Sequence, residues 1–385
     1  MNTPLPGITI VSVAFFVASS VGCFLSLMLF FSRKGNMKAN KYLALLIFCF
    51  SLLQIWDVLI QTGLLVDYPH MLLVLNPLLF VLGPLIYFYV RALTSLDWKF
   101  RRMLVIHFLP AAGLYAYFFP IYSLSGEDKV RLIAKAFLNH EFIINPAFYI
   151  CGEIHILAYL LFSVRILVEH SRSIRNSFSF TEQVSLTWLR NLLIIFIVLW
   201  LAFAVRVFYH SPVIWEISAF LALTTIYVIG YFGYNQPLIF PKPKIAAEPE
   251  PDQAEKKKYA TSALTEMEID NYLSKLRALM DTERLFQRTD LKLDDVAEKL
   301  DLPSYYVSQV INQKLGKNFY DFVNEYRVEE VKRRFADKKY DNMTILAAGL
   351  DSGFNSKTAF YSAFKKKTGV TPTAFKKNPI QAQLQ

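Results

Sequence analysis

Polar side chains that are able to read a base sequence occur at helical spacing in the C-terminal third of the chain. Residues 304–311 carry Tyr305, Ser308 and Gln309 on one face of a helix. The other face is apolar and consists of Val307, Val310 and Ile311. Hydroxyl and amide groups of this kind form hydrogen bonds with base edges in the major groove of DNA. The pattern therefore predicts a helix that packs on one side and meets DNA on the other.

Lysine residues dominate the sequence that follows. No acidic residue occurs after Asp351, and the segment contains Lys357, Lys365, Lys366, Lys367, Lys376 and Lys377. Lysine ammonium groups neutralise backbone phosphates without reading the base sequence. We therefore expect a phosphate-binding face that includes Lys365, Lys366, Lys367 and Lys376. The alternative is a basic tail that is merely solvated.

Ionisable residues inside long apolar segments are candidates for sensing a signal: Asp57, Glu153, His155, Arg206 and Glu216. Each is a candidate by default, because an unpaired charge in lipid is costly. Glu153 and His155 are two positions apart and point to different sides of a helix, which argues against a metal site. Arg206 and Glu216 lie near the outer ends of adjacent segments, so the alternative for them is a structural ion pair. Asp57 lies well inside its segment and is the better candidate for a ligand or proton contact.

No catalytic motif accompanies these residues. The sequence contains no HExxH, GxSxG, P-loop or protein-kinase pattern. The three cysteines, Cys23, Cys49 and Cys151, fall in apolar segments and do not have the spacing of metal ligands. We therefore expect neither an enzyme nor a bound cofactor or metal.

Two pairs of short helices are needed to position the polar groups. The first pair covers 293–300 and 304–311, with the apolar residues of each helix at helical spacing and with Asp301 and Pro303 in the turn. The second pair covers 344–350 and 357–364. There Gly353 supplies the turn, Asn355 or Ser356 caps the second helix, and the core is filled by Phe354, Phe360 and Phe364. Two such pairs, each able to place its second helix in a major groove, predict a DNA-binding domain.

These residues also resemble a known family. The segment Gly353-Phe354-Asn355-Ser356, with Phe360, Ala363-Phe364-Lys365-Lys366, Gly369 and Thr371-Pro372, is similar to the signature of the AraC-family DNA-binding domain. The unit 293–311 and the segment 324–328 resemble that family's first helix-turn-helix unit and connecting helix, so the likeness covers about residues 290–377.

The resemblance implies a rigid monomer whose two units read successive major grooves on one face of DNA. It also implies base-facing positions for Tyr305, Ser308 and Gln309 in the first unit, and for Lys357, Thr358, Tyr361 and Ser362 in the second. Three positions depart from the family pattern: Asp301, Pro303 and Gly349 replace the usual Gly, Ser and Ala. Because a glycine inside a helix costs roughly 1 kcal/mol relative to alanine, Gly349 predicts a less rigid second unit.

The N-terminal two thirds of the chain is apolar. Of the 385 residues, 54% are hydrophobic and only 19% are charged, which excludes a disordered or collagen-like chain. Residues 8–31 contain no charged side chain and are long enough to cross the roughly 30 Å hydrocarbon layer. Further apolar stretches cover 42–65, 71–90, 103–122, 144–168, 191–209 and 215–235. We predict seven transmembrane helices, since runs of this length are too long for barrel strands.

The short loops between these stretches differ in charge. One set contains eleven basic residues: Arg33, Lys34, Lys38, Lys41, Arg91, Lys99, Arg101, Arg102, Arg172, Arg175 and Arg190. The opposite set contains only Lys129, Arg131 and Lys135. Because cytoplasmic loops carry the excess of Lys and Arg, we predict that the N-terminus lies outside and the C-terminus in the cytoplasm. The architecture is similar to that of bacterial membrane-embedded AraC-type regulators, which implies an inner-membrane location.

The chain is therefore predicted to be all-α, with a seven-helix transmembrane bundle followed by a cytoplasmic helical domain that contains two helix-turn-helix units. The predicted membrane domain covers 1–236, a linker with five prolines covers 237–260, and the DNA-binding domain covers 261–385. One further helix carries Ile269, Leu273, Leu276 and Met280 on a single face. That face either packs on the first helix pair or forms the seam of a homodimer.

These features predict a membrane-anchored, sequence-specific transcription regulator. Its partners would be double-stranded DNA and membrane lipid, in keeping with a net charge of +10. The bundle is expected to sense a small-molecule or envelope signal. The alternative is a transporter or membrane anchor protein that carries a DNA-binding regulatory tail.

Overall fold

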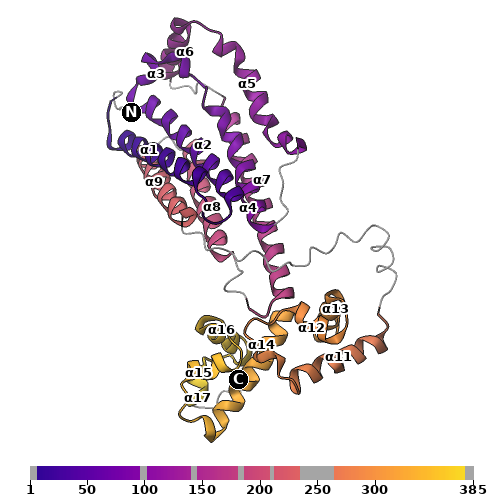
Figure 1. Cartoon of the computed structure of the whole chain (residues 1–385). Helices are drawn as coiled ribbons and strands as arrows, with labels where there is room; N and C mark the ends of the chain where they lie inside the picture. Colours follow the sequence, from indigo (N-terminus) through magenta and orange to yellow (C-terminus); the bar gives the residue numbers. More distant parts are fainter. Residues whose placement is uncertain are drawn as a thin grey trace. The chain divides into compact units, whose positions relative to one another are not determined.

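The computed structural model describes residues 7–95, 102–139, 145–180, 186–208, 212–234 and 264–377. Every regular element in these ranges is helical, and one isolated antiparallel bridge joins Phe178 to Lys292. The all-α prediction is thus confirmed for this part of the chain. The chain divides into two compact units, Met1–Val168 with Leu186–Leu238 and Glu169–Ser185 with Ile239–Gln385 (Figure 1).

The first unit is a bundle of apolar helices. Its α-helices are α1 (Ile10–Phe31), α2 (Met37–Thr62), α3 (Leu64–Asp67), α4 (Leu79–Thr94), α5 (Leu109–Tyr122), α6 (Gly126–Asn139), α7 (Pro146–Ser177), α8 (Thr187–Phe208) and α9 (Pro212–Tyr234). Short 3-10 turns occur at η1 (Pro69–Met71), η2 (Asn76–Leu78) and η3 (Arg102–Phe108). The last nine residues of α7 belong to the second unit.

Six helical segments in the described ranges are long and apolar enough to cross a membrane. They are Ile10–Phe31, Met37–Thr62, Pro69–Thr94, Arg102–Tyr122, Ala147–Ser177 and Thr187–Val205. Within α9 the apolar stretch Glu216–Gly230 is shorter. Six of the seven predicted spans thus have a matching helix of sufficient length, and the seventh remains a prediction.

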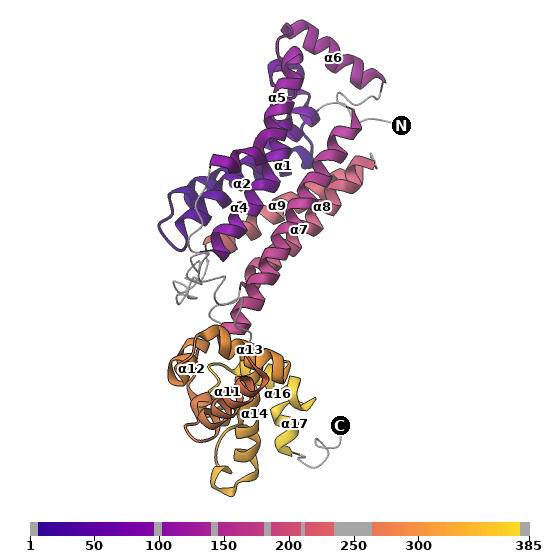
Figure 2. The same cartoon turned by 90° about the vertical axis from the view of Figure 1, so that its right-hand side faces the viewer.

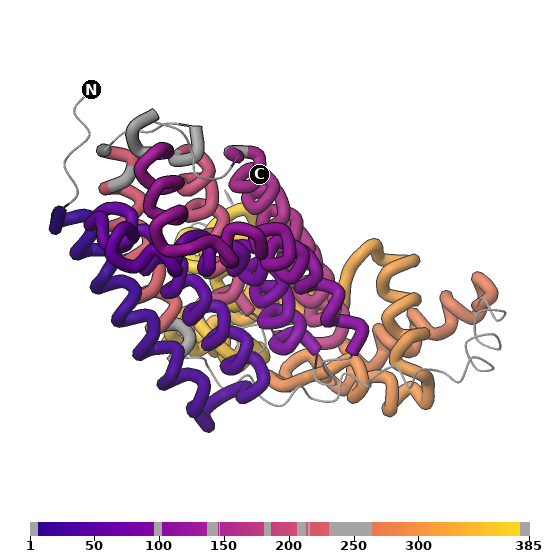
Figure 3. The backbone as a smooth tube through the Cα atoms, turned by 90° about the horizontal axis from the view of Figure 1, so that it is seen from above, coloured from indigo at the N-terminus to yellow at the C-terminus, as the bar shows by residue number. Residues whose placement is uncertain are grey.

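Small residues allow the first two helices to pack closely. A Cβ atom at Gly22 of α1 would lie 2.0 Å from the Ser51 hydroxyl of α2, so a larger residue there would require the Ser51 side chain to move. The Ser26 hydroxyl donates a hydrogen bond to the carbonyl of Ala44, at 2.9 Å. Close approach on small residues is typical of helix pairs in membranes, where the lipid tails are as apolar as the side chains. The two helices run beside each other in Figure 3.

A buried lysine holds α6 in place. This helix folds back at an angle from the end of α5 (Figure 2). Lys129 on α6 is 1% exposed, and its ammonium group lies 3.0 Å from Nδ1 of His70 and 2.9 Å from the carbonyl oxygen of Tyr122. The sequence placed this lysine in a loop, where a solvated side chain is the ordinary expectation.

The second unit contains the helices of the predicted DNA-binding domain. They are α11 (Glu266–Asp281), α12 (Leu293–Leu300), α13 (Ser304–Leu315), α14 (Phe319–Ala336), α15 (Ile345–Asp351), α16 (Lys357–Thr368) and α17 (Pro372–Lys377), with 3-10 turns η4 (Leu285–Gln287) and η5 (Lys338–Tyr340). In Figure 1, α14 lies between α11–α13 and α15–α17.

The two ends of α14 belong to separate hydrophobic cores. Phe319, Phe322 and Val323 pack with α11, α12 and α13. Val328 and Val331 pack instead with the phenylalanines of α16 and α17. Because one straight helix contributes to both cores, it fixes the spacing of the two helix pairs.

The apolar face of α11 is used within this unit. Leu276 and Met280 are fully buried in the core of the first helix pair, and Leu273 packs against it. Of the two alternatives for this helix, the structure shows the packed one.

Candidate nucleic-acid interface

The first helix pair is α12 and α13. Asp301 ends α12 in the left-handed conformation, with φ 52° and ψ 47°, as its tolerance of this region predicts. Val307, Val310 and Ile311 on α13 are buried. The opposite face carries Tyr305, which is 64% exposed, and Ser308 and Gln309, which are half-buried.

The second helix pair is α15 and α16. The Ser356 hydroxyl accepts a hydrogen bond from the backbone N–H of Ala359, at 3.0 Å, so Ser356 is the cap that the sequence left open between two residues. Gly353 has φ 103°, and a Cβ atom there would lie 2.4 Å from the Phe286 carbonyl oxygen. The predicted core residues Phe354, Phe360 and Phe364 are all buried.

Gly349 is explained by its neighbour Phe360. A Cβ atom at position 349 would lie 2.5 Å from Cδ1 of the Phe360 ring, which packs directly on the α15 backbone. The ring occupies the space that an alanine methyl group would need. Helix propensity alone predicted a less rigid second unit. The contact between Gly349 and Phe360 could not be seen from the sequence.

The outward face of α16 carries the other four side chains that are predicted to face bases. Lys357, Thr358 and Ser362 are exposed, and Tyr361 is half-buried. The ammonium group of Lys357 lies 5.6 Å from the centre of the Tyr361 ring, and the Tyr361 hydroxyl lies 3.4 Å from that of Thr373. All seven predicted base-facing side chains therefore lie outside the buried core, and their contact with DNA stays a prediction.

Three of the four lysines predicted to contact phosphates have partners within the domain. Lys366 binds both carboxylate oxygens of Asp321 at 2.7 and 2.8 Å, and Lys367 pairs with Glu325. The Lys376 ammonium group donates to the carbonyl of Met343 at 3.2 Å, and Lys365 is exposed. The acidic partners on α14 lie more than forty residues upstream, so the absence of acidic residues after Asp351 concealed these pairs.

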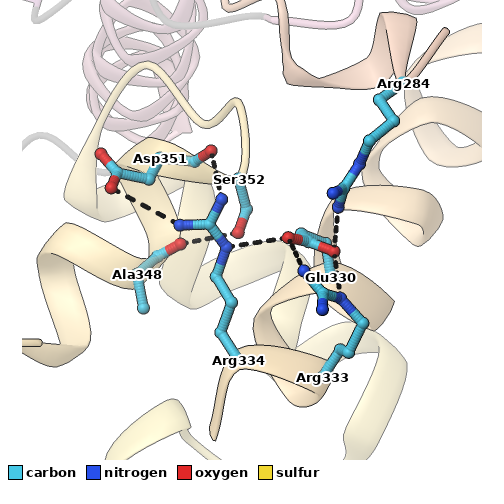
Figure 4. A network of polar contacts seen from close by, with 7 residues as sticks. All are labelled: Arg284, Glu330, Arg333, Arg334, Ala348, Asp351 and Ser352. Carbon is cyan, nitrogen blue, oxygen red and sulfur yellow. Dashed lines mark hydrogen bonds and ion pairs between the residues drawn. The ribbon is translucent and has the colours of Figure 1, made fainter. Parts of the chain in front are cut away.

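A charged network joins the two helix pairs through α14 (Figure 4). Glu330 accepts hydrogen bonds from Nε of Arg333 and Nε of Arg334, at 2.8 and 2.9 Å, and pairs with Arg284. Arg334 also donates to the carbonyl of Asp351 at the end of α15, at 3.2 Å. Burial by itself would raise the pKa of Glu330, but the hydrogen bonds from Arg333 and Arg334 and the charge of Arg284 outweigh it and lower the pKa to about 2.

The membrane candidates do not converge on one site. Asp57 is buried in α2, Glu153 and His155 are half-buried in α7, and Glu216 is exposed. The backbone of Arg206 lies in α8, but the structure does not describe its side chain. The predicted ion pair between Arg206 and Glu216 therefore lies outside the described part of the chain. Among the described residues, no group of three His, Cys, Asp or Glu side chains could hold a metal ion.

Sequence reasoning missed an aromatic cluster around His155. The ring of His155 lies 5.1 Å from that of Phe80 and 4.9 Å from that of Tyr159, between centres. Nδ1 of His107 lies 2.6 Å from the Tyr159 hydroxyl. His107 and His155 come from separate helical segments 48 positions apart, so no local pattern signals that Tyr159 contacts both.

The comparisons with known proteins concern the C-terminal part of the chain. Residues 296–378 match the family profile described as a helix-turn-helix domain. This part of the chain is an AraC-type helix-turn-helix domain. The match begins at Val296 within α12 and extends past the end of α17.

Two relatives show how far the similarity extends. An uncharacterized helix-turn-helix-type transcriptional regulator of Staphylococcus aureus (strain COL) is 29% identical over 102 residues, which are 26% of this chain and 13% of that protein. The melibiose operon regulatory protein of Escherichia coli (strain K12) is 28% identical over 87 residues, 23% of this chain and 28% of that protein. The chain thus covers less than a third of the length of either relative, and no solved structure matches it significantly.

Proposed function

We propose that the protein is a membrane-anchored, sequence-specific DNA-binding transcription regulator. The observation that carries this proposal is the exposed polar face of α13 together with that of α16, held by α14 within an AraC-type domain. A helix-turn-helix unit reads DNA by placing its second helix in the major groove. The names of both relatives, a transcriptional regulator and an operon regulatory protein, agree with this function.

The base-facing set consists of Tyr305, Ser308, Gln309, Lys357, Thr358, Tyr361 and Ser362. Hydroxyl, amide and ammonium groups at these positions supply donors and acceptors to base edges. Lys365 binds a backbone phosphate, and Lys366, Lys367 and Lys376 add positive charge near it while they brace the domain.

The N-terminal unit forms a seven-helix transmembrane domain with its N-terminus outside, so the DNA-binding domain lies in the cytoplasm beneath a bacterial inner membrane. The six long apolar helices and the distribution of Lys and Arg support this arrangement. The bundle senses a small-molecule or envelope signal. Such a signal acts through its different affinity for two states of the bundle.

Genome-wide crosslinking of the full-length, membrane-inserted chain to DNA tests the proposal. We expect a small number of discrete promoters to be occupied. The double variant Gln309→Ala with Tyr361→Ala should lose these sites, and Ser274→Ala on the exposed face of α11 should keep them. Occupancy without discrete sites in the unaltered chain would contradict the proposal.

A further inference from the structure

A segment from the membrane half of the sequence is built into the DNA-binding domain. Phe178, directly after α7, forms an antiparallel bridge with Lys292, which precedes α12. The next residue, Ser179, donates from its backbone N–H and its hydroxyl to the carbonyl of Leu291, at 3.2 and 2.7 Å. Both side chains are buried, and Phe178 packs with Ile174 and Phe180. All of these residues belong to the second compact unit.

Ser179 also accepts hydrogen bonds from a buried arginine on α14. Arg327 is 1% exposed. Its Nε atom donates to the carbonyl of Phe286 at 2.7 Å, Nη1 donates to Oδ1 of Asn324 at 3.1 Å, and Nη2 donates to the carbonyl of Arg288 at 2.7 Å. The remaining two bonds go to Ser179, from Nη1 to its carbonyl at 2.9 Å and from Nη2 to its hydroxyl at 3.0 Å.

These contacts use all five N–H donors that a guanidinium group possesses. Burial lowers the pKa of Arg327 to about 9, so the group is still charged at neutral pH. A buried charged donor that loses its acceptor is destabilised far more than an exposed one. Two of the five acceptors lie in a segment more than eighty residues before α11, so the helices α11 to α17 alone leave this arginine incompletely bonded.

Arg327 lies where the two helix pairs meet. A Cβ atom at Gly353, in the turn of the second pair, would lie 2.9 Å from Nε of Arg327, and the guanidinium group lies 5.8 Å from the centre of the Phe354 ring. Its other partners, the carbonyls of Phe286 and Arg288, lie in the segment that leads into the first pair. Within the described ranges, the hydrogen bonds between residues 178–180 and the domain go to Leu291 and Arg327, neither of which is a predicted base-facing residue.

We propose that Arg327, the backbone carbonyl of Leu291 and the backbone of Lys292 form a docking site for residues 178–180, and that occupancy of this site couples the membrane domain to DNA binding. The proposal rests on the proposed function. The docked segment fixes the position of the Arg327 guanidinium group. That group in turn holds the turn at Gly353, in the second helix pair, in place relative to the first pair. Because α7 runs directly into this segment, a movement of α7 withdraws Ser179 and leaves two donors of Arg327 without a protein acceptor. The docked state is the one that binds DNA tightly.

Disulfide trapping in the full-length chain tests the docking itself. Bridged residues have Cα atoms about 4.5–5.5 Å apart, which is within the range of a disulfide. In a chain without the native cysteines, Phe178→Cys with Lys292→Cys should form a disulfide in membranes. The two fragments should then remain joined after cleavage at a protease site placed in the linker. The control pair is Phe178→Cys with Lys299→Cys, at the other end of α12. Equal crosslinking of both pairs would overturn the docking site.

DNA affinity of full-length variants tests the coupling. Ser179→Ala removes the hydroxyl that Arg327 and Leu291 share, and specific binding should weaken by about threefold to tenfold with an unchanged salt slope. Ser179→Thr keeps the hydroxyl and should bind like the unaltered chain, as should the matched control Ser177→Ala. If Ser179→Ala binds as tightly as Ser177→Ala, the coupling is wrong while the proposed function stands. If the unaltered chain shows no specific binding, both fail.

Discussion

Gln309 on α13 and Tyr361 on α16 are two of the residues that we predict to contact bases. Both are half-buried beside a core and carry a polar group on the outward face of their helix. Lys365 and Lys366 are adjacent in sequence, yet Lys366 is held by Asp321 whereas Lys365 is exposed. We predict that Gln309 and Tyr361 report the base sequence, whereas the lysines contribute charge.

Gln309→Ala and Tyr361→Ala should each reduce discrimination between specific and random DNA. A good contact with a base edge is worth about 1–3 kcal/mol, so specific binding should weaken by that amount and random binding should change little. Competition binding against both kinds of DNA measures the difference, with Ser274→Ala as the control. An equal loss on both DNAs would remove these residues from the base-facing set.

Lys365→Ala and Lys366→Ala should have different effects, because the first changes only DNA binding and the second also changes the stability of α16. Loss of Lys365 should weaken binding to all sequences alike and reduce the slope of log K against log salt by about one. Loss of Lys366 should in addition remove the ion pair between α16 and α14, so hydrogen exchange at the end of α16 should become faster. Salt titrations and hydrogen exchange of the full chain distinguish the two variants, and identical behaviour would refute the distinction.

At the scale of elements, α14 determines how the two helix pairs are spaced. It contributes to both hydrophobic cores and carries Glu330, Arg334 and Arg327, which bond to segments on either side of it. The rest of the spacing depends on close packing, as where the Phe360 ring packs on Gly349 in the second pair. Substitutions at these positions should therefore change the spacing between the two helix pairs more than the structure within either pair.

Gly349→Ala should destabilise the second helix pair even though alanine is the better helix former. The added methyl group meets the Phe360 ring at 2.5 Å, and overpacking of this kind typically costs about 1–3 kcal/mol, more than the roughly 1 kcal/mol that helix propensity returns. Hydrogen exchange of the α15 and α16 amides measures the effect. Adding Phe360→Leu should restore part of the lost protection, whereas strictly additive losses would show that the ring is not the cause.

The network around Glu330 should make α14 sensitive to acid. Because the pKa of this carboxyl is lowered from 4.5 to about 2, its stabilising effect is fully present above pH 4.5 and is lost as the pH falls toward 2. The shift corresponds to about 3 kcal/mol. Hydrogen exchange of α14 between pH 5 and pH 2 should therefore accelerate less in Glu330→Gln than in the unaltered chain, after correction for the intrinsic pH dependence. Parallel curves would show that the network does not contribute.

For the whole molecule, the central question is which side of the membrane each unit faces. The proposed arrangement, with the N-terminus outside and the DNA-binding domain in the cytoplasm, needs an odd number of crossings. It therefore requires α9, whose apolar stretch Glu216–Gly230 is shorter than the other six, to be a seventh crossing. The segment α6 is predicted to lie outside, because its loop is poor in basic residues relative to the others.

Cysteine labelling of intact cells should confirm this arrangement. In a chain whose native cysteines have been replaced, Lys135→Cys on the exposed face of α6 should react with a membrane-impermeant maleimide. Lys365→Cys on α16 should react only after the membrane is opened. Reaction of both positions in intact cells would require an even number of crossings between them.

Local patterns in the sequence were sufficient for the helices, the turn residues and the aromatic core. Side chains at helical spacing, a left-handed Asp301, a capping Ser356 and buried Phe360 all follow from interactions within a few residues, which are the interactions that a sequence displays. The six long apolar helices likewise follow from length and polarity, which are the features that a helix in lipid needs.

The tertiary structure decided the contacts between residues that are far apart in the chain. Asp321 with Lys366, Lys129 with His70, and Arg327 with Ser179 join positions separated by 45, 59 and 148 residues. Folding brings the two residues of each pair together. Their positions in the sequence do not indicate that they are close in space. The sequence therefore determined which surfaces exist, whereas only the folded chain decided which charges remain available to DNA and which residues connect the domain to α7.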